Sequence, residues 1–361
     1  MRKLLASCLT SLFLTALLAG QRHTENVLLV TLDGLRWQDV FGGADNRMMN
    51  AKDGGVKDLL AARKRFTRSS PEASREVLMP FLWRVMAKEG QLFGDPNHNA
   101  KAVILNPHKF SYPGYSELIC GVVDEAINSN NKLYNRNINV LEYLNSLPAY
   151  QDRVATFAGW DVHEFIVNKP RSGIFCEVAW QPITVAKSDR RRRELQQMLD
   201  HLPRYWENFS WDALTFARAK EYLEVKKPRV LYVALGETDE WAHARRYDLY
   251  LQMMQRNDSM VRTLWEWLQQ DPQYQGKTSL IVTVDHGRGR TPRDWTDHNA
   301  KVQGSEEIWM AVMGPDTEAM GVREDVTATQ AMIASTVAAL LGEDFQQRSP
   351  KAAPPLPGVI R

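Results

Sequence analysis

The sequence has few cysteines, no excess of one charge and no internal repeat, and each absence excludes a class of protein. Its 361 residues include only 3 cysteines, too few for a disulfide-rich scaffold. Lysine and arginine number 45 against 43 aspartates and glutamates, so the balance indicates no basic surface for nucleic acid or an anionic membrane. Hydrophobic residues make up 44% of the chain, which is typical of an ordinary globular protein.

The first residues follow the pattern of a signal peptide. Arg2 and Lys3 precede an apolar run that ends in small residues at Gly20. We therefore expect residues 1–20 to be a signal peptide, and residues 21–361 to form one domain that is secreted or periplasmic. A buried N-terminal helix and a retained membrane anchor are the alternatives, although the run is short for a span of roughly 20 residues. After cleavage we expect 43 charged residues of each sign and no membrane span.

Two cysteines follow the expected cleavage point. Cys120 and Cys176 match neither the spacing of a zinc ribbon nor that of a CxxC redox motif. They pair in an oxidising compartment or remain two small buried thiols, and the sequence leaves both interpretations open.

Apolar, β-branched runs alternate with segments of helical apolar spacing along the chain. This alternation predicts an α/β sandwich of three layers, with a central, mainly parallel sheet and helices on both faces. The expected strands lie at residues 26–34, 101–106, 153–160, 228–236, 279–287 and 307–314. The expected helices lie at residues 80–90, 139–147, 192–202, 211–223, 247–268 and 327–342.

Polar residues follow four of the expected strands. In chain order these residues are Asp33, Ser111, Asp239 and the adjacent pair Asp285 and His286. In parallel sheets ligands bind beyond the carboxyl ends of the strands, so we expect these side chains to meet at one edge.

Two further histidines extend this set. His243 follows Asp239 by four residues, and His298 lies in a loop, where its neighbour Asp297 is a rival ligand. Oxygen and imidazole donors without thiolates suit zinc, with manganese as the alternative. About seven donors are too many for one tetrahedral ion, so we predict two divalent metal ions.

The order of these motifs resembles that of the alkaline phosphatase superfamily. The resemblance rests on an aspartate, a serine two residues before a proline (Ser111 and Pro113), D-x-x-x-H, D-H-G and a last histidine. It runs from about Val27 to Gly342 and is greatest for the nucleotide pyrophosphatase/phosphodiesterase and sulfatase-like branches. It implies an alkaline-phosphatase-like fold with two metal sites. One site would use Asp239, His243 and His298, and the other Asp33, Asp285 and His286, with Ser111 Oγ bridging towards it.

In this interpretation Ser111 is the nucleophile. Coordination to a dication favours the alkoxide of a serine that is otherwise a poor nucleophile. Pro113 suits the first turn of a helix, whose free N–H groups and positive end favour an incoming anion. Ser116 is the rival nucleophile, although we expect it to point from the body of that helix.

Two positions depart from the motifs of these relatives. Tyr115 replaces the arginine of the C/S-x-P-x-R sulfatase motif, which argues against oxidation of Ser111 to formylglycine. Gly114 stands where the phosphodiesterases usually have an asparagine, so it offers the substrate only a backbone N–H. We expect Asn106 or Lys109 to supply the missing donor.

The predicted function is hydrolysis of small-molecule phosphate esters, monoesters or diesters, by two metals through a covalent phosphoserine. A sulfatase-like or phosphonate hydrolase is the alternative enzyme. A metal-stabilised binding protein is the alternative of a different class, since fold does not imply function. Neither the leaving group nor the oligomeric state follows from the sequence.

Overall fold

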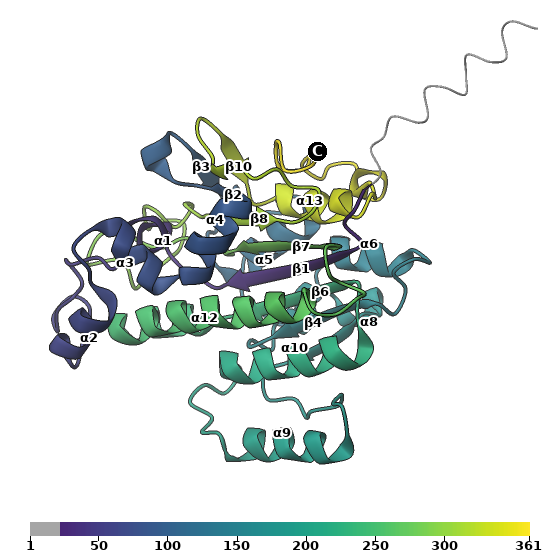
Figure 1. Ribbon diagram of the computed structural model, residues 1–361, viewed down its shortest axis with the longest axis horizontal. Helices are drawn as coiled ribbons and strands as arrows, with labels where there is room; N and C mark the ends of the chain where they lie inside the picture. The colour runs from purple at the N-terminus through teal and green to yellow at the C-terminus, as the bar shows by residue number, and fades with distance from the viewer. Residues whose placement is uncertain (1–21) are drawn as a thin grey trace, which may run out of the picture.

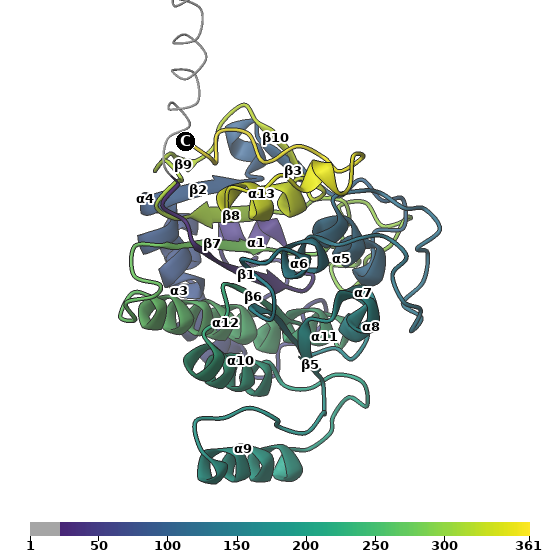
Figure 2. The ribbon, with the colours of Figure 1, turned by 90° about the vertical axis from the view of Figure 1, so that its right-hand side faces the viewer.

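A computed structural model describes residues 22–361, so the expected signal peptide lies outside the described residues. Its centre is an eight-stranded sheet with the strand order β5-β4-β6-β1-β7-β8-β2-β9 (Figures 1 and 2). The strands are β1 Asn26–Leu32, β2 Gly90–Phe93, β4 Val154–Ala158, β5 Phe175–Val178, β6 Val230–Leu235, β7 Thr278–Thr283, β8 Met310–Met313 and β9 Gly321–Val322.

The middle of the sheet is parallel. Strand β1 pairs in parallel with β6 on one side and β7 on the other, and only β8 runs antiparallel to its neighbours β7 and β2. Every residue of β1, β6 and β7 is buried. Strands covered on both faces are nearly continuous in hydrophobic residues, which explains the apolar runs in the sequence.

Helices cover both faces of this sheet, as predicted. Helices α3, α10 and α12 lie on one face, and α5, α6 and α13 lie on the other (Figures 1 and 2). The helices of seven or more residues are α2 Leu59–Phe66, α3 Pro71–Leu78, α5 Ser111–Cys120, α6 Val140–Ser146, α9 Asp189–His201, α10 Asp212–Lys226, α11 Glu237–His243, α12 Tyr247–Leu268 and α13 Met332–Leu340. The shorter ones are α1 Trp37–Gly42, η1 Leu82–Met86, α4 Ala87–Glu89, η2 Pro96–His98, α7 His163–Ile166, α8 Lys169–Ser172 and η3 Phe345–Gln347.

Three predicted elements differ in the structure. The strand expected at residues 101–106 is the shorter β3 (Lys101–Val103), which pairs with β10 (Thr327–Thr329) in a separate two-stranded sheet. The first residues of the helix expected at residues 327–342 therefore form β10, and the helix itself begins only at Met332. The helix expected at residues 80–90 contains the π-helix η1, so its hydrogen bonding changes along its length.

The small β3–β10 sheet reaches the carboxyl end of β7. Gln330, just after β10, is fully buried, and its Nε2 donates to the carbonyls of Val284 and Asp285 at 2.8 and 2.9 Å. Ser111 follows β3 along the chain. The segment that leads to Ser111 thus begins in a different sheet from the three strands that precede Asp33, Asp239 and Asp285.

The cysteines remain apart. Cys120 and Cys176 are both free and buried, and burial raises the pKa of each thiol to about 12. No helix among residues 22–361 is long and apolar enough to cross a membrane.

Candidate active site

The register of three neighbouring strands brings two of the predicted ligands together. Leu32 of β1 pairs with Leu235 of β6, and Thr31 pairs with Thr283 of β7, so the carboxyl ends of the strands lie side by side. Asp33 follows β1 directly and is 6% exposed, whereas Asp285 lies just beyond β7 and is 0% exposed. Both carboxylates therefore reach one buried point.

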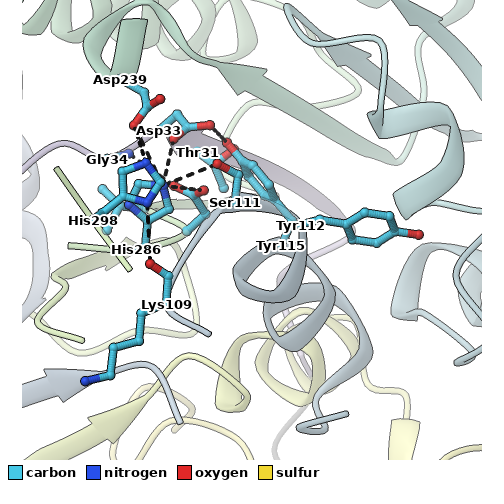
Figure 3. Close-up of polar contacts among 12 residues, drawn as sticks. Thr31, Asp33, Gly34, Lys109, Ser111, Tyr112, Tyr115, Asp239, His286 and His298 are labelled. Carbon is cyan, nitrogen blue, oxygen red and sulfur yellow. Dashed lines mark hydrogen bonds and ion pairs between the residues drawn. The ribbon is translucent and has the colours of Figure 1, made fainter. Parts of the chain in front are cut away.

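Helix α5 brings Ser111 to the same point. Ser111 is the first residue of α5, and its Oγ lies 3.3 Å from His286 Nε2 (Figure 3). Gly114 lies against the backbone of Asp285, and a Cβ at this position would overlap the Asp285 carbonyl. The glycine therefore allows the helix to pack close to the end of β7.

This packing role replaces the role predicted for Gly114. The Gly114 N–H donates to the carbonyl of Phe110 at 3.0 Å, as in an ordinary helix. The sequence prediction that this N–H would bind the substrate is therefore not supported by the geometry.

Asp33, Asp285 and His286 form the first cluster, and each carboxylate has one oxygen held by the protein and one without a partner. Tyr115 OH donates to Asp33 Oδ2 at 2.9 Å, and the Gly34 N–H donates to Asp285 Oδ1 at 3.1 Å. Asp33 Oδ1 and Asp285 Oδ2 are buried without a hydrogen-bond partner, and each lies 3.3 Å from His286 Nε2. Buried acceptors of this kind suit a cation, so the residues fit a metal.

The charges of the first cluster also fit a cation. Burial and the charge of Asp33 raise the pKa of Asp285 well above its ordinary value. Burial alone would lower the pKa of His286, but the negative charges of Asp285 and Asp33 raise it to about 9. His286 Nδ1 lies 2.9 Å from the Gly287 carbonyl, so donation there directs Nε2 at the two carboxylates.

Asp239, His243 and His298 form the second cluster. Asp239 and His243 lie one turn apart on α11, and His243 Nε2 is 3.2 Å from Asp239 Oδ2. His298 Nε2 is 2.9 Å from His243 Nε2 and 3.5 Å from Asp239 Oδ1. Burial, followed by the charge of His286, lowers the pKa of both histidines, so each has a neutral nitrogen available for a metal.

The two clusters adjoin. The rings of His286 and His298 stack with centroids 3.7 Å apart. Donor atoms of Asp239, His286 and His298 lie within 4.8 Å of one another, as do those of the first cluster. The seven predicted residues thus meet at one place, with His286 between the clusters.

Arg288 is a residue that sequence reasoning missed. Its fully buried guanidinium contacts Asp239 Oδ1 and donates to the carbonyls of Gly34 and Thr296 at 3.2 and 2.7 Å. A single arginine in a loop matches no sequence motif. Its position two residues after His286 was the one feature of the sequence that indicated a place near the site. Arg288 joins the loop after β1, helix α11 and the loop that leads to His298.

A cavity of about 300 Å³ opens beside Ser111. The cluster residues in its wall are Asp33, Ser111, Asp239, His243 and His298, and the remaining lining residues are Asn130, Trp160, Asn208, Phe209, Gly236 and Glu240. The Tyr112 N–H donates to Asn130 Oδ1 at 3.0 Å, which holds the Asn130 side chain in the cavity that Ser111 also lines. Asn130 was also missed, because nothing in its local sequence marks it.

The other predicted or rival residues lie elsewhere. Asn106 is buried away from the cavity, where its Nδ2 donates to Glu117 and its Oδ1 accepts from the Lys109 N–H. The Lys109 side chain extends away from the cluster (Figure 3), and its Nζ pairs with Glu306. Ser116 accepts from Asn135 inside the core, and Asp297 is exposed and in neither cluster. The prediction that Asn106 binds the substrate is therefore not supported.

The fold and the family now define the class of protein. The family model described as "Sulfatase" matches residues 113–343, more than half of the chain, so the chain belongs to the sulfatase family. Members of this family and of the wider alkaline phosphatase superfamily are hydrolases that use divalent metal ions. The match begins two residues after Ser111, so Ser111 and Asp33 lie outside it.

Solved structures of the superfamily share the fold. A mutant of the alkaline phosphatase PafA has a TM-score of 0.56 at 9% identity, over 94% of this chain and 99% of that one. Phosphonate monoester hydrolase from Silicibacter pomeroyi has a TM-score of 0.55 at 11% identity, over 89% and 74% of the two chains. An inactive murine ectonucleotide pyrophosphatase/phosphodiesterase 5 with AMP has a TM-score of 0.50 at 13% identity, over 92% and 96%. No curated protein matches the sequence. The superfamily and fold predicted from the sequence are thus confirmed.

Proposed function

We propose that this chain is an exported two-metal hydrolase of phosphate esters, with Ser111 as the nucleophile. The observation that carries the proposal is the set of two unpartnered buried carboxylate oxygens, Asp33 Oδ1 and Asp285 Oδ2, facing His286 beside the Ser111 hydroxyl. A binding protein would have no need of a hydroxyl at the end of a helix next to such a cluster.

In this proposal Asp33, Asp285 and His286 hold one divalent ion, and Asp239, His243 and His298 hold the other. Bound there, zinc or manganese would supply Lewis acidity and charge for the developing alkoxides. Asn130 has its carbonyl oxygen engaged by the Tyr112 N–H, so its amide nitrogen is the donor left for a phosphoryl oxygen. Asn130 thereby takes the role that the sequence assigned to Gly114 and Asn106.

The reaction has two steps in which Ser111 forms and loses a bond. Ser111 Oγ attacks phosphorus, the ester P–O bond breaks, and the leaving alcohol receives the proton. Water then attacks the phosphoserine, which releases the phosphate product and restores the hydroxyl. The positive end of α5 lies at the phosphoryl oxygens during both steps.

The test is hydrolysis, by protein loaded with zinc or manganese, of aryl phosphate monoesters, phosphate diesters, phosphonates and sulfates. We expect phosphate esters to be hydrolysed, and Ser111→Ala to lower kcat by at least about a thousandfold while leaving the fold intact. Ser116→Ala is the matched control and should retain turnover. Undiminished activity of Ser111→Ala would show that another group attacks phosphorus.

Sulfate-ester hydrolysis is the second candidate, because the family match is to sulfatases. Against it, Tyr115 stands at the position of the motif arginine, and its hydroxyl is engaged by Asp33. Turnover restricted to the sulfates in the panel would select this candidate.

Export is tested separately. We expect the exported protein to begin close to Gln21, as determined by mass spectrometry of its N-terminus. An intact Met1 on protein recovered from the cytoplasm would contradict export.

A further inference from the structure

Tyr115 holds one oxygen of an aspartate in the first cluster. It lies one helical turn after Ser111 on α5, so both side chains project from the same face of the helix towards that cluster (Figure 3). The Tyr115 hydroxyl donates to Asp33 Oδ2 at 2.9 Å, because an ionised carboxylate can only accept. The other oxygen, Asp33 Oδ1, is left buried without a hydrogen-bond partner.

The surroundings of Asp33 leave this carboxylate little freedom. The Asp33 N–H donates to the Leu235 carbonyl at 2.9 Å, and the Asp33 carbonyl accepts from the Thr238 hydroxyl at 2.6 Å. Rotation of the side chain is therefore the movement that remains, and Tyr115 restrains it. Tyr115 is itself fixed, since it is 1% exposed and its ring packs edge-on against that of His163 with centroids 4.5 Å apart.

Asp285 is restrained in the same way by a backbone donor. The Gly34 N–H donates to Asp285 Oδ1 at 3.1 Å, so only Oδ2 remains for a ligand. Each aspartate of the first cluster thus offers a metal one oxygen instead of two. Together with His286 Nε2 and Ser111 Oγ, these oxygens make four donor atoms.

The spacing of the four donors matches a small four-coordinate ion. Both free carboxylate oxygens and Ser111 Oγ lie 3.3 Å from His286 Nε2. A tetrahedron with bonds of roughly 2.0–2.1 Å, the length that zinc forms with nitrogen and oxygen, has edges of roughly 3.3–3.4 Å. Manganese and calcium, by contrast, ordinarily take about six or more ligands, most of them oxygens. The first cluster is therefore better suited to zinc.

We propose that Tyr115 determines which metal the first cluster accepts. By holding Asp33 Oδ2, it limits the cluster to four donors and favours zinc over manganese. This inference rests on the metal sites of the proposed function. Tyr115 is a positioning residue, because it acts on the metal through Asp33. Without its hydroxyl, Asp33 Oδ2 is free to bind the metal as well, and the site gains a fifth donor.

The experiment compares Tyr115→Phe with Tyr232→Phe. Tyr232 is 0% exposed, and its hydroxyl lies 3.2 Å from Thr31 Oγ1 and makes no hydrogen bond to either cluster among residues 22–361. Each substitution removes one buried hydroxyl and keeps the ring, so a general loss of packing would affect both alike. Each is made in a parent that carries His243→Ala and His298→Ala, which removes two ligands of the second cluster and restricts tight metal binding to the first.

Competition between zinc and manganese, followed by elemental analysis, gives the ratio of the two affinities in each protein. Sites of nitrogen and oxygen donors generally prefer zinc, so the informative quantity is the change in this ratio. We expect Tyr115→Phe to lower the ratio about tenfold or more, because partners of a ligand set its coordination. Tyr232→Phe should keep a ratio close to that of the parent.

Cobalt(II), which replaces zinc, reports the number of donors by its visible spectrum. We expect the intense absorption of four-coordinate cobalt in the parent and in Tyr232→Phe. Tyr115→Phe should show the weaker spectrum of higher coordination. This readout is independent of turnover, and loss of packing alone would not produce it.

Each outcome decides for or against the inference. An unchanged affinity ratio and cobalt spectrum in Tyr115→Phe overturn the role of Tyr115 and leave the hydrolase proposal standing. Equal changes in Tyr232→Phe attribute the effect to packing and also overturn it. If Tyr115→Phe does not fold, a weak, six-coordinate spectrum in the parent overturns the four-donor site, and an intense one supports it. A wild type that binds no metal overturns the proposed function, and the inference falls with it.

Discussion

The two clusters of metal-type residues are built in different ways. Asp33, Asp285 and His286 follow paired strands, and the side chains of Asp285 and His286 are 0% exposed. Asp239, His243 and His298 come from a seven-residue helix and a loop, and the side chain of His243 is 44% exposed. Sheet register fixes the first cluster, whereas the second depends on side chains that hold α11 and the loop.

We expect the largest effect when single substitutions in the two clusters are compared for metal binding and turnover. Asp33→Ala removes a carboxylate from the more buried cluster, so we expect metal affinity and kcat to fall at least about a thousandfold. His243→Ala removes an exposed ligand that water can replace. Its activity should fall less and recover in excess metal, as measured by elemental analysis and by turnover at increasing metal concentration. If both variants lost activity equally, and excess metal restored neither, the two clusters would not differ in this way.

Chelation should reveal the same order in the wild type. We expect a chelator to strip the exposed cluster first and the buried one much more slowly, with a stepwise fall in Tm. Bound metal adds its binding free energy to folding, so each loss lowers the free energy of unfolding. Time-resolved metal release and differential scanning calorimetry provide the measurement. A single release phase would mean that the clusters act as one unit.

Arg288 tests how the second cluster is held. Arg288→Met removes a fully buried guanidinium from the partly exposed carboxylate of Asp239, so we expect it to lower the free energy of unfolding. Arg288→Lys keeps the positive charge but loses the guanidinium N–H donors that reach the carbonyls of Gly34 and Thr296. We expect Arg288→Lys to weaken metal affinity about 10–100-fold at the second cluster and to leave the first intact. Titration with a metal indicator checks this, and equal weakening of both sites would contradict it.

The smallest expected effect concerns the carboxyl pair that holds α11. Asp212 accepts from the Gly236 N–H at 2.7 Å, and Glu237 accepts from the Asp212 N–H at 2.8 Å. Burial, then the charge of Glu237, raises the pKa of Asp212 well above its ordinary value, and burial raises that of Glu237. Above about pH 4 the folded state therefore retains protons that the unfolded chain has lost.

The sign of the pH dependence follows from those raised pKa values. As the pH rises from about 4 towards the folded pKa, this pair should lower the free energy of unfolding, by up to about 1.4 kcal/mol per pH unit for each proton. Asp212→Asn should lose the part of this slope that comes from Asp212, even though its altered hydrogen bonds change the overall stability. Urea unfolding of both proteins over this pH range provides the measurement. Parallel curves would show that the pair does not titrate in this way.

Much of the fold could be predicted because long buried strands and amphipathic helices have strong sequence patterns. The predicted helix at residues 247–268 coincides with α12, and five of the six predicted strands lie in the central sheet. Strands β2 and β5 were missed, and each spans only four residues. Strand β8 is equally short but was predicted, because the apolar run there also includes Ile308 and Trp309. The order of Asp, Ser and His motifs sufficed to identify the superfamily.

The site was less accessible to prediction, because its supporting residues carry no pattern of their own. Asn130 and Arg288 come from loops, and only the folded chain shows what they contact. Asn106 and Gly114 were chosen by proximity in sequence, but each is engaged within its own segment. The roles of the seven clustered residues remain predictions, although the structure gathers them in one place.

The pairing of β3 with β10 has a consequence for the order in which the chain is completed. The segment that leads to Ser111 is held by residues that follow all seven clustered residues in the chain, and Gln330 then ties that small sheet to the end of β7. A nascent chain that ends before Thr327 contains every proposed ligand and the serine, yet lacks the partner strand of β3, which leads to the serine. The hydrolytic activity proposed for this chain would therefore appear only after the last part of the chain has folded.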